Sequence, residues 1–310
     1  MQAFPWRSLH LHHGLPIEPL LIQGLAPFIQ EYVSKGQIHS WFFVRYNARG
    51  HHLRLRFKGP HANLQEKAAT WFTNYMQQHP SRETQWLDHV PEDLLPNNSI
   101  HAVPYIPEIT RYGGVSALPI AEDQFCLSSR VTLCIMSQTG RWDYSRALGS
   151  AVQLHLCGAH AMGLSLAEMR RFFAGISQDW LVRAYDWNPQ TPKETHLRLQ
   201  AETRSKFISA FERHKDRLVS HSKALWQALA SNPHFEEAWL NDWIRGMADV
   251  GMRLSRVFPA SALPEDTPTQ NGRISAIHES LVHMTNNRLG ILNCDEAYLG
   301  FLLEQIALHL

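Results

Sequence analysis

The segment WFFVRYNARGHHLRLRF, residues 41–57, contains the clearest structural signal in this chain. Residues 41–46 are rich in aromatic and β-branched side chains, which favour a β-strand. Residues 47–50 supply the Asn and Gly of a tight turn. Residues 52–57 then alternate strictly between polar and apolar side chains, as expected of a strand with one buried face. The segment therefore predicts an antiparallel β-hairpin.

Helical patterns surround this hairpin. Apolar residues recur at helical spacing over residues 17–35. A second helix is expected to begin after the Gly-Pro pair at 59–60 and to reach Gln78. Beyond about Ile120 the pattern is almost entirely helical, and residues 192–231 are expected to form one long helix. The sequence thus predicts an α+β fold, with antiparallel strands and helices in the N-terminal part and a mostly helical C-terminal half.

Length and composition bound the domain organisation. The chain has 310 residues, enough to bury a large core in one domain or in two. With 44% hydrophobic and 18% charged residues, it has the composition of a folded globular protein rather than a disordered one. We expect a single domain over residues 1–310, with a strand-rich part at 1–138 and a helical part at 139–310.

The charge balance and the N-terminal residues narrow the class of protein. Lys and Arg number 29 and Asp and Glu number 28, so the formal net charge is +1. This balance argues against a protein whose main function is to bind the phosphate backbone of nucleic acid. The N-terminus has no apolar signal-peptide core, and no stretch approaches ~18 uninterrupted apolar residues. We therefore expect a cytoplasmic protein that acts neither on membranes nor directly on nucleic acid.

Two arginines on the second strand of the hairpin are candidate anion-binding residues. Because side chains alternate across a strand, Arg54 and Arg56 should face the same side, about 7 Å apart. Each guanidinium offers a rigid fork of donors, which suits a carboxylate or a developing oxyanion. The simpler interpretation is that this face of an edge strand is exposed to solvent. The pattern leaves both open.

Arg111 is a third candidate cation. It precedes Tyr112 and the pair Gly113-Gly114, which permits backbone conformations that other residues avoid. Glu108, three residues earlier, could pair with Arg111 and hold it in place. From spacing alone, a purely structural Glu–Arg pair in a loop explains the same residues.

A histidine near the C-terminus is the candidate proton-transfer group. On a helix, Ser280, His283 and Asn287 share one face, because they are three and four residues apart. Asn287 could orient the imidazole, and a histidine can move protons near neutral pH. The alternative is a histidine with a structural role.

Metal ions and cofactors are not predicted. The four cysteines are widely spaced, which indicates free thiols. The histidine groups lack Cys, Asp or Glu partners at metal-ligand spacing; these groups are 10–13, 51–52, and 155 with 160. No glycine-rich nucleotide-binding motif is present either.

Three segments in this order resemble one known family. Residues 41–57 are similar to its "FFIRY…HLRLRF" motif, with Asn-Ala-Arg where the family often has Asp-Pro. Residues 105–114 match its Y-x-P-E-x-x-R-Y-G-G motif, and residues 280–288 match its S-x-x-H-M-x-x-N-R motif. The family is the lantibiotic dehydratase C-terminal domain, also called the thiopeptide-type bacteriocin biosynthesis domain. The resemblance spans about residues 6–310.

This resemblance implies an activity and its partners. In the family, a separate glutamylation domain uses glutamyl-tRNA to esterify Ser and Thr of a ribosomal precursor peptide. The C-terminal domain then eliminates glutamate and leaves dehydroalanine or dehydrobutyrine. The chain is too short to include the glutamylation part, so we expect a stand-alone elimination subunit. Its partners would be the precursor peptide and a separate glutamylation subunit, and a homodimer is left open.

The resemblance also implies roles for individual residues. The expected catalytic residues are Arg54, Arg56, Arg111 and His283, which would stabilise anionic charge and transfer the proton. The expected orienting or substrate-binding residues are Glu108, Tyr112, Ser280, Asn287 and Arg288. Glu108 would orient Arg111. His283 could act as base or as acid, and we expect it within about 15 Å of the arginines, across one cleft.

Two other functions are weighed against elimination. Proteins of the same superfamily catalyse the formal [4+2] cycloaddition that closes the pyridine-centred macrocycle of thiopeptides. The retained arginines and His283 favour elimination over cycloaddition. The third candidate is a non-catalytic subunit that docks the precursor peptide.

Overall fold

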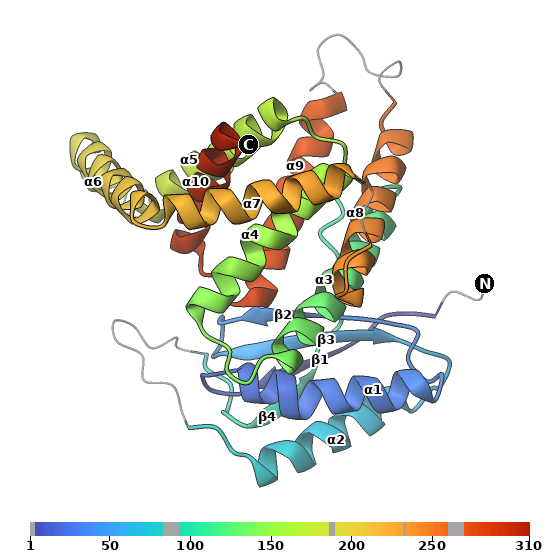
Figure 1. Cartoon of the computed structure of the whole chain (residues 1–310). Coiled ribbons are helices and arrows are strands. Elements are labelled where there is room, and N and C mark those ends of the chain that lie inside the picture. The colour runs from blue at the N-terminus through green and yellow to red at the C-terminus, as the bar shows by residue number, and fades with distance from the viewer. Residues whose placement is uncertain (1–3, 83–92, 186–189, 232–233, 260–269) are drawn as a thin grey trace. The chain divides into compact units, whose positions relative to one another are not determined.

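A computed structural model describes residues 4–82, 93–185, 190–231, 234–259 and 270–310. These residues form a β-sheet and a series of α-helices (Figure 1). The chain divides into two compact units, which are described separately. The sheet unit comprises Met1–Ile109 and Phe125–Trp142, and the helical unit comprises Thr110–Gln124 and Asp143–Leu310. The predicted α+β class is confirmed, whereas the expectation of a single domain stays a prediction.

The sheet has four antiparallel strands in the order β2-β3-β1-β4. They are β1 (Arg7–His12), β2 (Ser40–Tyr46), β3 (His52–Lys58) and β4 (Ser99–Ala102). Strands β2 and β3 form the predicted hairpin, in which Trp41 pairs with Phe57 and Tyr46 with His52. At its turn Arg49 and Gly50 both have positive φ, 62° and 101°. Such values favour glycine at the second position.

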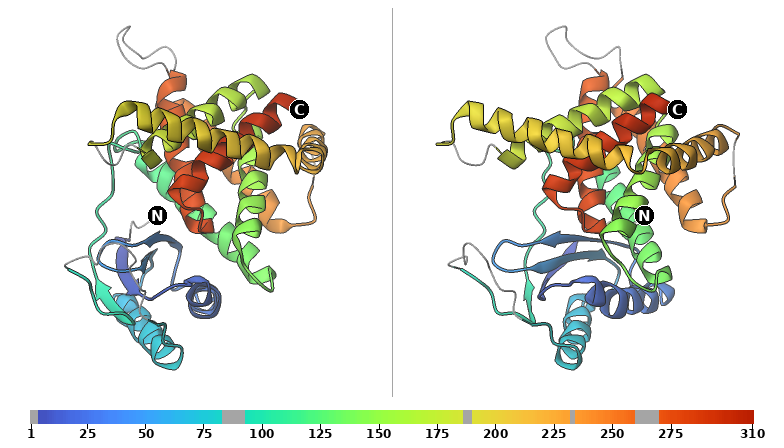
Figure 2. Two further views of the ribbon diagram at one scale, coloured as in Figure 1. Left: turned by 90° about the vertical axis from the view of Figure 1, so that its left-hand side faces the viewer. Right: turned by 60° about the vertical axis from the view of Figure 1, so that its left-hand side comes forward.

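Alternation along the strands separates an apolar face from a polar one. Helices α1 (Ala26–Ser34) and α2 (Leu64–Gln78) cover the apolar face (Figures 1 and 2). A π-helical turn, Leu20–Leu25, leads into α1, so the helix predicted from periodicity is confirmed. The core beneath these helices includes the strand residues Leu9, Leu11, Trp41, Phe43, Leu53, Leu55 and Phe57.

The opposite face of the sheet carries the polar side chains. In β3 these are His52, Arg54 and Arg56, as the strict alternation predicts. Strand β1 adds His10 and His12, which lie opposite Arg54 and His52 in the register. Strand β1 was not predicted, although its sequence, SLHLH, alternates in the same way.

The helical unit is built from α4 to α10 and the start of α3. Their bounds are α3 Leu118–Gln138, α4 Tyr144–Ala161, α5 Leu166–Tyr185, α6 Lys193–Glu212, α7 Lys215–Ala230, α8 Ala238–Val257, α9 Gln270–Leu289 and α10 Asn293–His309. The helix expected over 192–231 is in fact two, because the chain turns at Arg213 and His214, between α6 and α7. Most of the linker predicted at 258–271 lies outside the described residues.

Helices α5 and α10 make the most extensive helix–helix contact of this unit. Gly300 explains their close approach. A Cβ atom there would lie 2.8 Å from Ser177 N and 2.9 Å from Phe173 O, both backbone atoms of α5. Only glycine allows the two backbones to meet at this point. Helix α10, which also carries Glu296, is thereby held against α5.

Every helix in the described ranges is too short or too polar to span a lipid bilayer.

Candidate functional site

Arg54 lies on the polar face of β3 and is held by an aromatic ring and an imidazole. Its guanidinium carbon is 3.4 Å from the ring centroid of Tyr46, and its Nε donates to His52 Nε2 at 3.2 Å. Burial lowers the pKa of Arg54, while Tyr46 and the negative charge of Glu108 raise it. Ring and imidazole together fix the plane of the guanidinium.

Arg56 is held by two aromatic rings. Its guanidinium carbon lies 4.7 Å from the ring centroid of Tyr105 and 5.3 Å from that of Phe42. The side chain is 9% exposed, so the charge is placed in a largely desolvated environment. Tyr105 begins the Y-x-P-E motif and Phe42 belongs to the first motif. The structure therefore joins these two sequence segments around one guanidinium.

Burial disfavours the charged forms of three histidines on this face, His10, His12 and His52. Burial, reinforced by the charges of neighbouring residues, lowers the pKa of His10 to about 3 and that of His12 to about 4. Burial also lowers the pKa of His52 to about 4, against a hydrogen bond to Gly50 O that raises it. Because charged forms are disfavoured here, the arginines dominate the charge of this surface.

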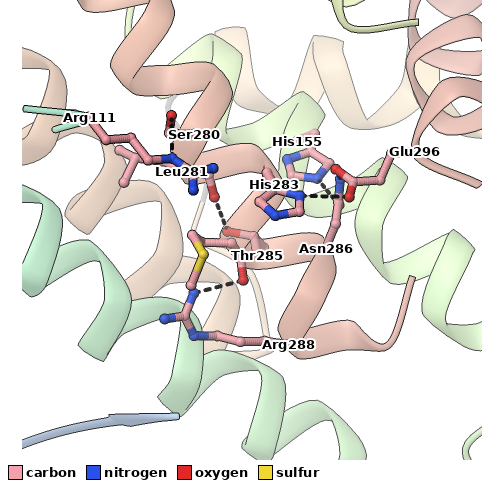
Figure 3. Close-up of polar contacts among 10 residues, drawn as sticks. Arg111, His155, Ser280, Leu281, His283, Thr285, Asn286, Arg288 and Glu296 are labelled. Carbon is pink, nitrogen blue, oxygen red and sulfur yellow. Dashed lines mark hydrogen bonds and ion pairs between the residues drawn. The ribbon is translucent and has the colours of Figure 1, made fainter. Parts of the chain in front are cut away.

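Arg111 belongs to the helical unit and reaches α9. Its Nε donates to Ser280 Oγ at 3.3 Å (Figure 3). The glycine after Tyr112 explains why the loop can pack so closely, since a Cβ at Gly113 would lie 2.7 Å from Ile277 Cδ1. Gly113 also has a φ of 82°, which favours glycine. The second and third sequence motifs therefore meet at this hydrogen bond.

His283, on α9, is bound by a buried carboxylate. Its Nδ1 donates to Glu296 Oε1 at 2.7 Å, and the two side chains are 21% and 1% exposed (Figure 3). Trp180 of α5 stacks on the imidazole, with ring centroids 5.0 Å apart. A carboxylate accepts here, so Nδ1 carries a hydrogen, and in the neutral imidazole the lone pair lies on Nε2. In that form Nε2 can accept a proton.

A chain of hydrogen bonds supports Glu296 from behind. Asn286 Nδ2 donates to Glu296 Oε2 at 3.0 Å, and His155 Nε2 donates to Asn286 Oδ1 at 2.7 Å. Burial lowers the pKa of His155 to about 4, so it stays neutral. Both carboxylate oxygens and the amide are thus oriented by buried partners, which makes the imidazole of His283 a preorganised group.

Glu279 links the electrostatics of Arg111 and His283. Burial raises the pKa of this carboxyl, and Asp179 raises it further. Arg183, Arg111 and His283 act in the opposite direction on the same group. Arg111 and His283 therefore both lie within electrostatic reach of one carboxylate. Glu279 belongs to no motif, although it directly precedes Ser280 in the sequence.

Several predicted site residues have other contacts. Arg288 is completely buried and its Nη1 donates to the backbone oxygen of Met284 at 2.7 Å, a contact that stabilises its own helix. Tyr112 is 3% exposed. The roles expected of Glu108, Asn287 and Arg288 stay predictions, as does a single site shared by Arg54, Arg56 and His283. The observed partner of His283 Nδ1 is Glu296, which no motif pointed to.

Comparison with known proteins places the chain in a family. The family profile described as "Lantibiotic biosynthesis dehydratase C-term" matches residues 6–307. No significant match is found among curated proteins. The matches described here are therefore the family profile and solved structures.

Three solved structures share the fold at low sequence identity. The pyridine synthase TbtD from thiomuracin biosynthesis has a TM-score of 0.75 and 16% identity, covering 98% of this chain and 97% of TbtD. TsrL has a TM-score of 0.65 and 18% identity, covering 98% and 94%. The tRNA-dependent lantibiotic dehydratase MibB from Microbispora sp. 107891 has a TM-score of 0.62 and 20% identity, covering 99% of this chain and 28% of MibB.

The profile covers almost the whole chain. The first motif includes Arg54 on β3, and the third includes His283 on α9. The chain belongs to the family of lantibiotic biosynthesis dehydratase C-terminal domains, which is linked to dehydratases and biosynthetic enzymes.

Proposed function

We propose that this protein eliminates glutamate from glutamylated Ser and Thr residues of a ribosomal precursor peptide. The observation that carries the proposal is the His283–Glu296 pair, because it fixes the hydrogen of the neutral imidazole on Nδ1 and leaves the lone pair on Nε2 of a side chain that is 21% exposed. The precursor peptide and a separate glutamylation subunit are the partners that this reaction requires.

The reaction needs a base and a site for negative charge. A base removes the Cα proton of the esterified residue, the Cβ–O bond breaks, and a Cα–Cβ double bond forms. Glutamate leaves as a carboxylate, so the products are the dehydro residue, glutamate and one proton on the base. Cationic or hydrogen-bond donors stabilise the enolate-like charge that develops at the neighbouring carbonyl.

In the helical unit, we assign these tasks to His283 and Arg111. His283 Nε2 accepts the Cα proton, while Glu296 keeps the opposite nitrogen protonated and faces the imidazolium that forms. Arg111, positioned by Ser280, stabilises the developing oxyanion. Glu279 lies in the electrostatic field of both groups and is a second carboxylate that can receive or release the proton.

In the sheet unit, we assign binding of an anionic substrate group to Arg54 and Arg56. The free carboxylate of the glutamyl group is the natural ligand for such a guanidinium pair. Aromatic rings and an imidazole orient these guanidinium groups.

Formal [4+2] cycloaddition is the second candidate. The fold match to the pyridine synthase TbtD covers nearly all of both chains, whereas that to MibB covers 28% of MibB. Such an enzyme would act on a peptide that already contains dehydroalanines. A docking function is the third candidate, and it gives no reason for a buried carboxylate behind His283.

The decisive experiment coexpresses the precursor peptide with a glutamylation enzyme and with either the wild-type protein or its His283→Ala variant. The intact mass of the peptide is then measured. If the protein eliminates glutamate, glutamyl adducts should accumulate with His283→Ala but not with the wild type. The elimination rate should fall by about 100- to 10,000-fold when one proton-transfer group is lost. His221→Ala, on an exposed position of α7, is the matched control and should give wild-type product.

The alternatives predict different masses. Neither a cycloaddition enzyme nor a docking subunit removes glutamate, so with either of them glutamyl adducts would persist in the wild-type culture as well, which would overturn the elimination proposal. Equal amounts of dehydrated peptide from the wild type and from His283→Ala would overturn the role assigned to His283.

A further inference from the structure

Three histidines of the polar sheet face converge on one point. His10 and His12 share a face of β1, and His52 lies opposite His12 on the neighbouring strand β3. The imidazole of His52 stacks on both others, with ring centroids 4.9 Å from His10 and 4.5 Å from His12. One ring nitrogen from each residue lies within 4.8 Å of the other two. This group is called the histidine triad below.

His12 is the residue that needs an explanation. Its side chain is 1% exposed, yet neither Nδ1 nor Nε2 has a hydrogen-bond partner. Leaving a buried polar group unsatisfied costs about 1–3 kcal/mol, so such groups usually have a role or an absent ligand. An imidazole without partners and with a free lone pair is a suitable metal ligand.

His52 can supply the third nitrogen. Its Nδ1 lies 2.8 Å from Gly50 O, and since a carbonyl only accepts, Nδ1 carries the hydrogen. The lone pair is therefore on Nε2, which at present accepts from Arg54 Nε at 3.2 Å. The carbonyl of Gly50 orients the ring from behind, as outer partners do for metal-binding histidines.

We propose that His10, His12 and His52 bind a divalent transition-metal ion such as zinc. Imidazole nitrogens suit zinc, copper, nickel and cobalt rather than magnesium or calcium. Three protein ligands leave a fourth position open for water or for an anionic group of a substrate. Sequence spacing could not reveal this site, because the third ligand comes from a different strand.

Metal binding and Arg54 are coupled in this proposal. A metal ion on His52 Nε2 takes the lone pair that Arg54 uses, so Arg54 must give up this hydrogen bond. The positive charge of Arg54 also opposes a cation at the triad. The metal would therefore bind more tightly when Arg54 is removed, a response that a surface-bound ion would not show.

The test is titration of the metal-free protein with Co²⁺, followed by visible absorption, and with Zn²⁺, followed by calorimetry. We expect one ion per chain and, in Co²⁺, the absorption of a four-coordinate site. His10→Ala and His12→Ala should each weaken binding by ~100-fold or more, because even loss of an outer partner weakens metal binding 10- to 100-fold. His51→Ala, next to the triad but outside it, is the matched control and should bind as the wild type does.

A second variant keeps the proposal falsifiable if the alanine variants unfold. Arg54→Ala retains the triad, and its affinity for Zn²⁺ should rise by about tenfold or more. Absence of one-to-one binding to the wild type would overturn the proposal. Equal affinities in the wild type and in folded His12→Ala, or weaker binding to Arg54→Ala, would overturn it as well.

Discussion

The arginine face of β3 and the histidine network around Glu296 place their functional groups by different physical means. Arg54 and Arg56 lie against Tyr46, Tyr105 and Phe42, whose rings orient a cation without neutralising it. His283 is instead bound by a carboxylate that is itself held by a buried amide.

The difference follows from what each group has to do. Aromatic rings fix the plane of a guanidinium that has to bind and release an anion. An imidazole that must accept a proton at one nitrogen needs the other nitrogen fixed, and a buried carboxylate does this. If aromatic rings orient the arginines and a buried carboxylate orients His283, substitutions in the two regions should have different effects.

The largest effect is expected from Glu296→Gln. A glutamine amide can donate to His283 Nδ1 and so favour the tautomer in which Nε2 carries the hydrogen, which removes the base. Loss of the correct tautomer can reduce the rate of such a group by up to about 10⁴-fold. The rate of glutamate elimination in a single turnover of the purified variant measures this loss.

Glu304→Gln is the matched control, because Glu304 is also a buried glutamate of α10 but lies away from His283. Its rate should stay near that of the wild type. If Glu296→Gln and Glu304→Gln have equal rates, then Glu296 does not position the imidazole.

Arg111 variants should have the next largest effect. Arg111→Ala removes the donor at the developing oxyanion, and loss of one such donor costs ~3 kcal/mol, or about a hundredfold or more in rate. Arg111→Lys keeps the charge but loses the planar fork, so it should recover part of the activity only. Glutamate release, measured for both variants, distinguishes them. Wild-type activity of Arg111→Lys would contradict recognition through the fork.

The network behind Glu296 predicts a pH dependence of stability. His155 is neutral in the folded protein until the pH falls to about 4, whereas its unfolded form takes up a proton near its usual pKa of about 6.5. Protons therefore favour the unfolded state in this window. The free energy of unfolding should fall by about 1.4 kcal/mol per pH unit from this residue as the pH decreases from about 6.5 to 4.

Denaturant titrations of the wild type and His155→Gln measure this contribution. Glutamine can still donate to Asn286 but does not titrate, so its stability should decline less steeply with acid. His221→Gln, at an exposed site, should follow the wild type. Parallel curves for wild type and His155→Gln would show that the network does not exclude protons.

The smallest effect is expected at Tyr46. Tyr46→Leu removes the ring beneath Arg54, and a cation–π contact of this kind contributes about 1 kcal/mol, equivalent to ~5-fold in affinity. The KM for the glutamylated peptide should rise while kcat stays constant. Tyr46→Phe retains the ring and should lie close to the wild type. A fall in kcat with unchanged KM would show that Arg54 acts in the chemical step rather than in binding.

Much of the fold follows from local patterns in the chain. The alternation in residues 52–57 predicts which side chains of β3 face the core, and the periodicity of residues 17–35 predicts the helix. The alternation of β1 carries the same information. The ends of helices can be predicted where Gly, Pro or Asn residues mark a turn. No such residue lies near Arg213 and His214, where the chain turns between α6 and α7.

The sequence marks only the motif residues of the candidate site, and their catalytic roles stay predictions. Arg54, Arg56, Arg111 and His283 stand in recognisable segments of the chain. Glu296 carried a weaker signal, as a carboxylate on an otherwise buried face of α10. A buried carboxylate requires a partner, but the sequence does not say which one.

The amino-acid sequence contains the alternations, the helical periods and the three motifs, since each of these depends on neighbours a few residues apart. The contact of Arg111 with Ser280 joins residues 169 positions apart, and that of His155 with Asn286 joins residues 131 positions apart. The histidine triad likewise draws on two strands that pair only in the folded sheet. Such pairings depend on how helices and strands pack, and packing is a property of the whole chain rather than of any segment.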